Sequence, residues 1–146
     1  SAFPFYNSQN SQVYSLVHCT SNREGFKLYK KSAWKVFGDQ SSTKKTHGED
    51  GQFVLNLDPN VGSVVTTSTD ESCFTVHDIT KYLQKSFSGR KGVHIEEMWA
   101  LLDEHPIFPS SYRNQIKQEL VEMYGATKEQ VVDPFTGKKE TVISFR

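Results

Sequence analysis

The chain has few cysteines and no long apolar run. Only Cys19 and Cys73 occur among its 146 residues, which excludes a disulfide-stapled scaffold and predicts a reducing, intracellular location, the cytoplasm. No apolar stretch approaches the ~20 residues that a membrane-spanning helix needs, so no membrane partner is expected. The first residues lack both a signal-peptide pattern and Met, which favours a fragment of a longer protein.

The chain also lacks an excess of either charge. Its 17 Lys and Arg balance its 17 Asp and Glu, which argues against an indiscriminate polyanion binder. The charges are nevertheless grouped, because residues 23–45 hold seven bases and two acids, whereas residues 49–71 hold five acids and no base. Such blocks fit either the solvated faces of neighbouring elements or a two-faced domain with one basic side.

Residues 1–70 are predicted to form a small strand–helix–strand unit. Residues 1–12 show no period and are expected to form a loose arm. The β-branched run Val13–Cys19 predicts a strand, and Gln52–Leu57 predicts another after a polar loop over 41–51. Residues 61–67 are expected to form either a further strand or an ordered loop.

A helix is expected between these two strands. Thr20, Ser21 or Asn22 can cap its first turn, which contains Glu24, and Gly38 stands where a C-terminal glycine belongs. One lysine, Lys30, falls within its apolar stripe. The stripe consists of Phe26, Tyr29, Lys30, Ala33, Trp34 and Phe37. We expect Phe26, Tyr29, Ala33 and Trp34 to face inward and Lys27, Lys31 and Lys35 to face solvent.

Residues 71–146 show a clearer pattern. A helix carrying Ile79, Tyr82, Leu83 and Phe87 is followed by a short extended piece at 93–95 and a second helix over 96–105 that Pro106 and Pro109 terminate. Ser110 or Ser111 can cap a third helix, whose expected buried residues are Ile116, Leu120, Met123 and Tyr124 and which Gly125 closes. Strands over 130–132 and 141–145 flank a turn.

This order of helix, short strand, two helices and hairpin is that of a winged helix, a helix-turn-helix with a β-hairpin wing. The predicted fold class is therefore α+β, a strand-helix unit followed by a winged-helix domain. The alternative is an unrelated small α+β domain with the same order. In the winged helix, three helical stripes and the inner wing strand share one core, so Trp99, Ile116, Leu120 and Phe145 should be buried together.

A winged helix offers its third helix and its wing as a binding surface. The third helix carries polar and basic side chains near its N-terminus, where the helix dipole favours a phosphate. Together with basic residues before and after the hairpin turn, the nucleic-acid-binding candidates are Tyr112, Arg113, Gln115, Lys117, Lys128, Lys138 and Lys139. These residues fit a solvated face equally well, and Glu119 and Glu122 on the same helix weaken the nucleic-acid interpretation. A second basic candidate face is Lys30, Lys31 and Lys35.

No constellation of residues indicates catalysis. The adjacent His18 and Cys19 would point to opposite faces of a strand, so they cannot join Cys73 and His77 around one zinc ion, and both cysteines are expected to be small buried apolar groups. The chain has no phosphate-binding glycine loop, no dinucleotide fingerprint and no evident nucleophile–base pair. We therefore expect no catalytic residue, no metal and no cofactor.

Two stretches resemble the three-Cys-motif partner protein family. Residues 14–22 read YSLVHCTSN, Gly25 follows, and residues 31–36 read KSAWKV, similar to the family's strand, threonine-asparagine phrase, glycine and helix closing on tryptophan. The later elements are similar to the family's C-terminal region; they are Ile95–Leu102, Pro106–Tyr112, Ile116–Gly125 and Ile143–Phe145.

Members of this family carry a methyltransferase-like nucleotide-binding domain before this region. The resemblance therefore implies a C-terminal portion whose methyl-donor site lies elsewhere, and no catalytic residue carries over. The leading function is nucleic-acid recognition on behalf of a larger enzyme, methyltransferase-like or related to phage defence. The alternative is a protein–protein docking module without nucleic-acid contact, and a self-contained hydrolase is disfavoured.

Overall fold

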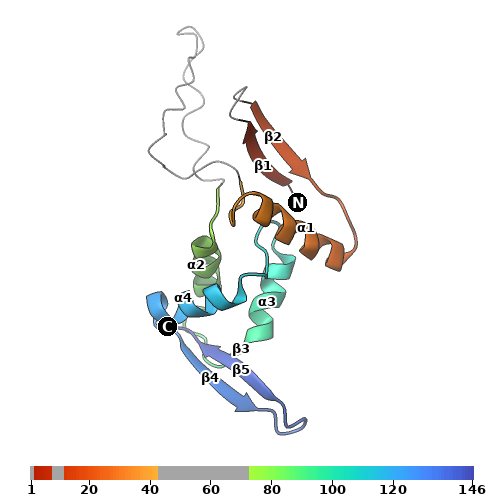
Figure 1. Ribbon diagram of the computed structural model, residues 1–146. Coiled ribbons are helices and arrows are strands. Elements are labelled where there is room, and N and C mark those ends of the chain that lie inside the picture. Colours follow the sequence, from red (N-terminus) through yellow and green to blue (C-terminus); the bar gives the residue numbers. More distant parts are fainter. Residues whose placement is uncertain (1, 8–11, 43–72) are drawn as a thin grey trace.

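The computed structural model describes residues 2–7, 12–42 and 73–146 (Figure 1). These residues form an α+β fold of four helices, one two-stranded hairpin and one three-stranded antiparallel sheet. The loop expected at 41–51 falls almost wholly outside the described residues, as do the strand at 52–57, the segment at 61–67 and the expected boundary near residue 70.

The chain begins with a strand, so the expected loose arm over 1–12 is wrong. Strand β1 (Ala2–Asn7) pairs antiparallel with β2 (Gln12–Val17), with Phe3 opposite Leu16. The ring of Phe3 is fully buried and packs edge-on against Tyr29 at 5.5 Å. The absence of a period concealed this strand, because its order comes from pairing with β2 and from burial of Phe3 against the next helix.

Helix α1 (Arg23–Val36) begins and ends where the sequence indicates. The Asn22 side chain accepts hydrogen bonds from the backbone N–H groups of Glu24 at 3.0 Å and Gly25 at 3.2 Å, which confirms a cap in the expected place. The chain leaves the helix at Gly38 with a left-handed φ of 76°. Ala33 and Trp34 are buried as expected, and Phe26 and Tyr29 are half-buried. Lys31 and Lys35 are exposed as expected, whereas Lys27 is half-buried.

The second half contains the expected elements in the expected order. They are α2 (Val76–Phe87), β3 (Val93–His94), α3 (Ile95–Glu104), α4 (Arg113–Tyr124), β4 (Thr127–Val132) and β5 (Lys139–Ser144). The sheet order is β3-β5-β4, all antiparallel, so β5 joins the hairpin to the short strand that precedes α3. In Figure 1 the hairpin extends beyond the helices, away from β1 and β2.

Two local expectations about α4 are wrong. The helix begins after Tyr112 without a side-chain cap, because the Ser110 hydroxyl donates to Asp103 Oδ1 at 2.6 Å instead. Met123 is 60% exposed. Its neighbour Tyr124 takes the inward position and stacks against His77 of α2 at 6.3 Å, which leaves Met123 on the solvent side of the last turn.

The helices and the sheet enclose one hydrophobic cluster. Trp99, Ile116, Leu120 and Phe145 are all at most 4% exposed and belong to it, as the winged-helix pattern predicted. The same cluster includes Trp34 of α1, so the first and second halves of the chain share a core. Among the described residues, no helix is long and apolar enough to cross a membrane.

This core predicts the effect of a cavity. Leu120 is fully buried, so Leu120→Ala should lower the free energy of unfolding by about 2–5 kcal/mol, measured by urea denaturation. The matched control is Val121→Ala on the same turn of α4, where the side chain is 42% exposed, and it should change stability by no more than about 0.5 kcal/mol. Equal effects of the two substitutions would contradict the packing of α4.

Candidate nucleic-acid interface

Helix α4 divides into a buried and a polar face. Ile116 and Leu120 are fully buried, whereas Asn114, Gln115 and Gln118 are exposed. Asn and Gln side chains can read base edges, and of these three only Gln115 was predicted from the sequence as a candidate. Gln115 Nε2 donates to Glu119 Oε1 and Gln118 Nε2 donates to Glu122 Oε1, both at 3.0 Å, so the helix itself orients these two amides.

Arg113 and Lys117 lie on the same side of α4, four residues apart. The Arg113 guanidinium lies over the Trp99 ring, 5.3 Å from its centroid, and its Nε donates to the Ser110 carbonyl at 3.3 Å. Arg113 is exposed and Lys117 is half-buried. Within the described part of the chain, neither forms an ion pair with an acid.

Tyr112 is in a different setting from the other candidates. Its hydroxyl donates to Asp39 Oδ1 at 2.7 Å, and its ring lies 5.8 Å from that of Trp34. Burial and the hydrogen bond to Asp39 raise the pKa of Tyr112, so it remains a neutral phenol. Tyr112 thus joins the start of α4 to α1 rather than offering its hydroxyl to a ligand.

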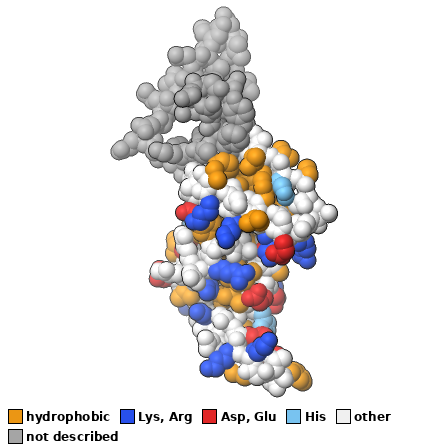
Figure 2. All heavy atoms as spheres, turned by 45° about the vertical axis from the view of Figure 1, so that its right-hand side comes forward, with side chains coloured by type: hydrophobic (Ala, Val, Ile, Leu, Met, Phe, Trp, Pro, Cys, Tyr) orange, Lys and Arg blue, Asp and Glu red, His pale blue; other side chains and the backbone are white. Residues whose placement is uncertain are grey.

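The remaining candidates lie on the hairpin. Lys128 is on β4, Lys138 follows the turn and Lys139 begins β5, and all three are exposed. None of them has an acidic partner among the described residues. Figure 2 shows Lys and Arg side chains spread over one face of the molecule, from the helical part down to the hairpin, with acidic side chains between them.

A cleft of about 300 Å³ lies between α1 and the start of α4. Its charged lining is Glu24, Lys27 and Lys31 from α1 and Arg113 from α4, and Ser110 and Ser111 supply hydroxyls. Lys27 is engaged by Glu24 at 3.1 Å and Asp103 at 3.5 Å, which leaves Lys31 and Arg113 as the cations without an acidic partner in this described region.

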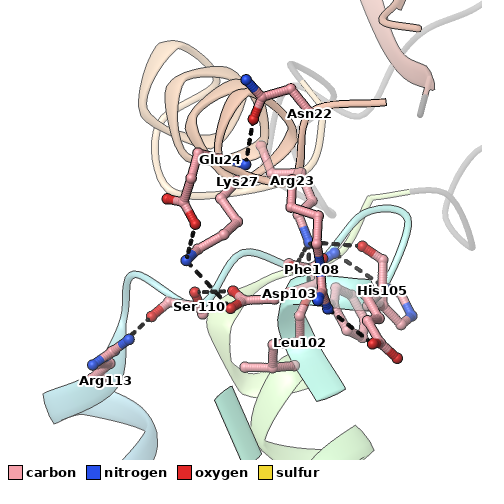
Figure 3. A network of polar contacts seen from close by, with 12 residues as sticks. Asn22, Arg23, Glu24, Lys27, Leu102, Asp103, His105, Phe108, Ser110 and Arg113 are labelled. Carbon is pink, nitrogen blue, oxygen red and sulfur yellow. Dashed lines mark hydrogen bonds and ion pairs between the residues drawn. The ribbon is translucent and has the colours of Figure 1, made fainter. Parts of the chain in front are cut away.

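A polar network joins α1 to the C-terminal end of α3 and to the turn that leads into α4 (Figure 3). Lys30, only 1% exposed, shares its three ammonium N–H groups among the carbonyl oxygens of Leu102, Asp103, His105 and Phe108 at 2.6 to 3.0 Å. Trp34 Nε1 donates to the Ile107 carbonyl at 3.0 Å. These donors satisfy the Asp103 carbonyl at the end of α3 and carbonyls of the turn that follows it, and Lys30 adds a second donor to the Leu102 carbonyl, which also accepts from the His105 N–H at 3.1 Å.

Burial lowers the pKa of Lys30 to about 8, so the ammonium remains the main form at neutral pH. The second candidate basic face, Lys30 with Lys31 and Lys35, therefore loses its first member. Lys31 and Lys35 are exposed, and Lys35 pairs with Asp39 at 2.8 Å. The burial of Lys30 was indicated in the sequence, because Lys30 falls within the apolar stripe of its helix.

His105 completes the turn between α3 and α4. Its Nδ1 accepts from the backbone N–H groups of Ile107 at 3.1 Å and Phe108 at 3.0 Å, and its ring stacks on Phe108 with centroids 4.1 Å apart. Burial and the nearby Lys30 ammonium lower the pKa of His105 to about 4. The neutral ring is required here, because a protonated Nδ1 cannot accept these bonds.

Among the described residues, the cysteines and histidines do not assemble into a site. Cys73 is buried, as expected, whereas Cys19 is exposed, because β2 ends at Val17 and Cys19 lies beyond it; the two thiols form no disulfide with each other. In the described part of the chain, no group of three His, Cys, Asp or Glu side chains is placed to hold a metal ion. Comparison with family models, with curated proteins and with solved structures finds no match for this chain.

The Lys30 network predicts a large difference between neighbouring lysines. Lys30→Met should lower the free energy of unfolding by about 2–5 kcal/mol, because several buried carbonyls lose their donor. Lys31→Met on the same helix is the control and should change it by no more than about 0.5 kcal/mol, since Lys31 is exposed. Urea denaturation at pH 7 measures both, and a stable Lys30→Met protein would refute the role assigned to the ammonium.

His105 predicts a pH dependence of stability. Its pKa of about 4 in the folded chain is below the ordinary 6.5, so the unfolded chain binds more protons between these values. The contribution of the neutral His105 ring to the free energy of unfolding is complete above about pH 6.5 and is lost as the pH falls towards 4. In His105→Asn, the amide oxygen can accept the same N–H groups without titrating, so its urea midpoint should fall less over this range. Parallel curves for the two proteins would contradict the prediction.

Proposed function

We propose that this chain contains a winged-helix module that binds nucleic acid. Its connectivity supports the assignment. The run α2, β3, α3, α4 and the β4–β5 hairpin follows the winged-helix order, and the pairing of β3 with β5 ties the wing to the helices. In such a module α4 is the recognition helix, and its exposed amide side chains lie where base edges are read.

The observation that carries the proposed binding function is which Lys and Arg side chains form ion pairs with acids and which do not. Arg113 and Lys117 on α4, and Lys128, Lys138 and Lys139 on the hairpin, have no acidic partner in the region that the structure describes. Arg23, Lys27, Lys35 and Arg90 instead each form an ion pair, whereas the exposed Lys31, Lys81 and Lys85 also have no acidic partner in that region. Cations left unpaired on a recognition helix and its wing are available to phosphate groups.

The acids of α4 oppose this function less than the sequence suggested. The Glu119 carboxylate turns towards α2, where Thr80 Oγ1 donates to it at 2.8 Å and His77 lies at 3.5 Å, and its side chain is 18% exposed. Glu122 remains exposed and accepts from Gln118. One of the two carboxylates is therefore withdrawn from the surface that would approach a phosphate backbone.

A protein-docking function is the second candidate, and a different feature favours it. Strand β4 lies at the edge of its sheet, and all six of its residues are exposed, including Val131 at 44% and Val132 at 55%. An edge strand can accept a further strand from a partner through its unpaired backbone groups. This function would need no contact from Arg113 or Lys117.

The resemblance to three-Cys-motif partner proteins extends the proposal to the parent protein. On this proposal, the module serves a larger protein that includes a methyltransferase-like domain, and it delivers that domain to nucleic acid. The methyl-donor site would lie in that domain and not in this module. Support for this part comes from the sequence phrases around residues 14–22 and 31–36.

The function is tested by a double substitution on α4. Arg113→Ala with Lys117→Ala should weaken binding to nucleic acid by roughly 2–4 kcal/mol, the sum of two charged contacts. It should also reduce the slope of log K against log salt by about two phosphate contacts. Fluorescence anisotropy over a salt series, with duplex DNA, single strands and structured RNA, measures both quantities.

Helix α2 supplies the matched control. Lys81 and Lys85 are also exposed cations four residues apart, and Lys81→Ala with Lys85→Ala removes the same charge from a different face. The control should retain most of the affinity. Equal losses in the two double variants would show a nonspecific charge effect, and absence of binding by the unmodified protein at low salt would favour the docking function.

A further inference from the structure

The turn between β4 and β5 is held in one shape by Asp133. Its carboxylate accepts from the Phe135 backbone N–H at 2.8 Å and from Thr136 Oγ1 at 2.7 Å, and its carbonyl accepts from Gly137 N–H at 2.8 Å. Asp133 N–H donates to the Lys138 carbonyl at 2.9 Å, which closes the turn. Gly137 adopts a left-handed φ of 66°, which a side chain would disfavour. The turn is therefore well suited to present a side chain in a fixed place.

The side chain that the β4–β5 turn presents is the solvent-exposed aromatic ring of Phe135. Phe135 is 96% exposed, more than any other large apolar residue in the described part of the chain. Burying such a ring is worth about 1.5–3 kcal/mol, and the folded chain forgoes this gain. Rigid aromatic side chains of this kind are frequent anchors of binding surfaces, because few rotatable bonds are ordered on contact.

The charges around the ring favour a polyanionic partner. Lys138 and Lys139 follow the turn and have no acidic partner among the described residues, whereas the Asp133 carboxylate is directed into the turn. Glu140 lies 2.9 Å from His94 Nδ1. In Figure 2 hydrophobic side chains lie at the lower end of the hairpin, with Lys or Arg side chains close above them. An exposed ring beside two free cations matches a base beside its phosphates.

We propose that Phe135 stacks on an unpaired base, while Lys138 and Lys139 contact the phosphates that flank it, so that the module prefers a duplex next to a single-stranded stretch. This inference rests on the proposed nucleic-acid function and specifies its ligand. An unpaired base offers an open face at no cost, whereas insertion into an intact duplex must first separate stacked base pairs. The single Phe135 ring at the β4–β5 turn therefore suits an unpaired base better than insertion into an intact duplex.

The test compares a blunt DNA duplex with the same duplex carrying a short single-stranded tail. Phe135→Ala should weaken binding to the tailed duplex by about 5- to 100-fold, the usual loss of one aromatic–base stack, and leave binding to the blunt duplex unchanged. Phe135→Trp should retain the preference, and its emission should be quenched by the tailed duplex alone, since Trp34 and Trp99 are buried in the core. Val132→Ala, an exposed apolar position on the same hairpin, is the control.

The outcomes separate this inference from the function on which it rests. Binding of both duplexes with no effect of Phe135→Ala would overturn the stacking role and leave the proposed function intact. An equal loss on blunt and tailed duplexes would place the ring in the groove of paired DNA, which also overturns the inference. If the unmodified protein binds neither duplex, both proposals fail together. A selective loss on the tailed duplex, absent in Val132→Ala, supports the stack.

Discussion

The buried Lys30 ammonium is the contact on which the arrangement of this protein depends. Helix α3 ends at Glu104, and without Lys30 the Asp103 carbonyl and the carbonyls of His105 and Phe108 in the following turn would lose the donor that they have here. Lys30 supplies these donors from α1 and places a positive charge at the negative end of the helix dipole. Because Trp34 donates to the same turn, α1 determines the path of the chain from α3 into α4. The first turn of the proposed recognition helix is thus set by a helix far earlier in the chain.

The charge balance of the chain does not describe its surface. Several carboxylates have structural roles: Asp39 accepts from Tyr112, Asp103 from Ser110, Glu119 from Thr80, and Asp133 from its own turn. Each of these carboxylates accepts a hydrogen bond from another residue of the chain. The bases of α4 and the hairpin, in contrast, have no acidic partner in the described region. A chain with zero net charge can therefore present unpaired cations where the proposed ligand would lie. Such a surface favours specific, salt-sensitive binding over general attraction to polyanions.

The folded chain combines a packed helical core with two exposed features, the polar face of α4 and the β4–β5 hairpin. The helices share one core, and the Lys30 network joins α1 to the end of α3, whereas the hairpin extends beyond the helices. Contacts built on regular elements are positioned more precisely than contacts on loops. The tip is itself held by Asp133, so Phe135 and the following lysines would give the proposed interface a second fixed contact point in addition to α4.

Local signals in the sequence were enough to predict the helices, most of the strands and the shared core. Asn22 caps α1, Gly125 closes α4 with a φ of 65°, and the apolar periods place Trp99 and Leu120 inside. Long-range contacts, in contrast, place Phe3 in a paired strand and bury Lys30. Both outcomes require partners distant in the sequence, the β2 strand in one case and carbonyls at the end of α3 in the other. The same holds for the candidate interface: residue types indicated the cations, but which of them remain unpaired depends on the acids that folding brings near.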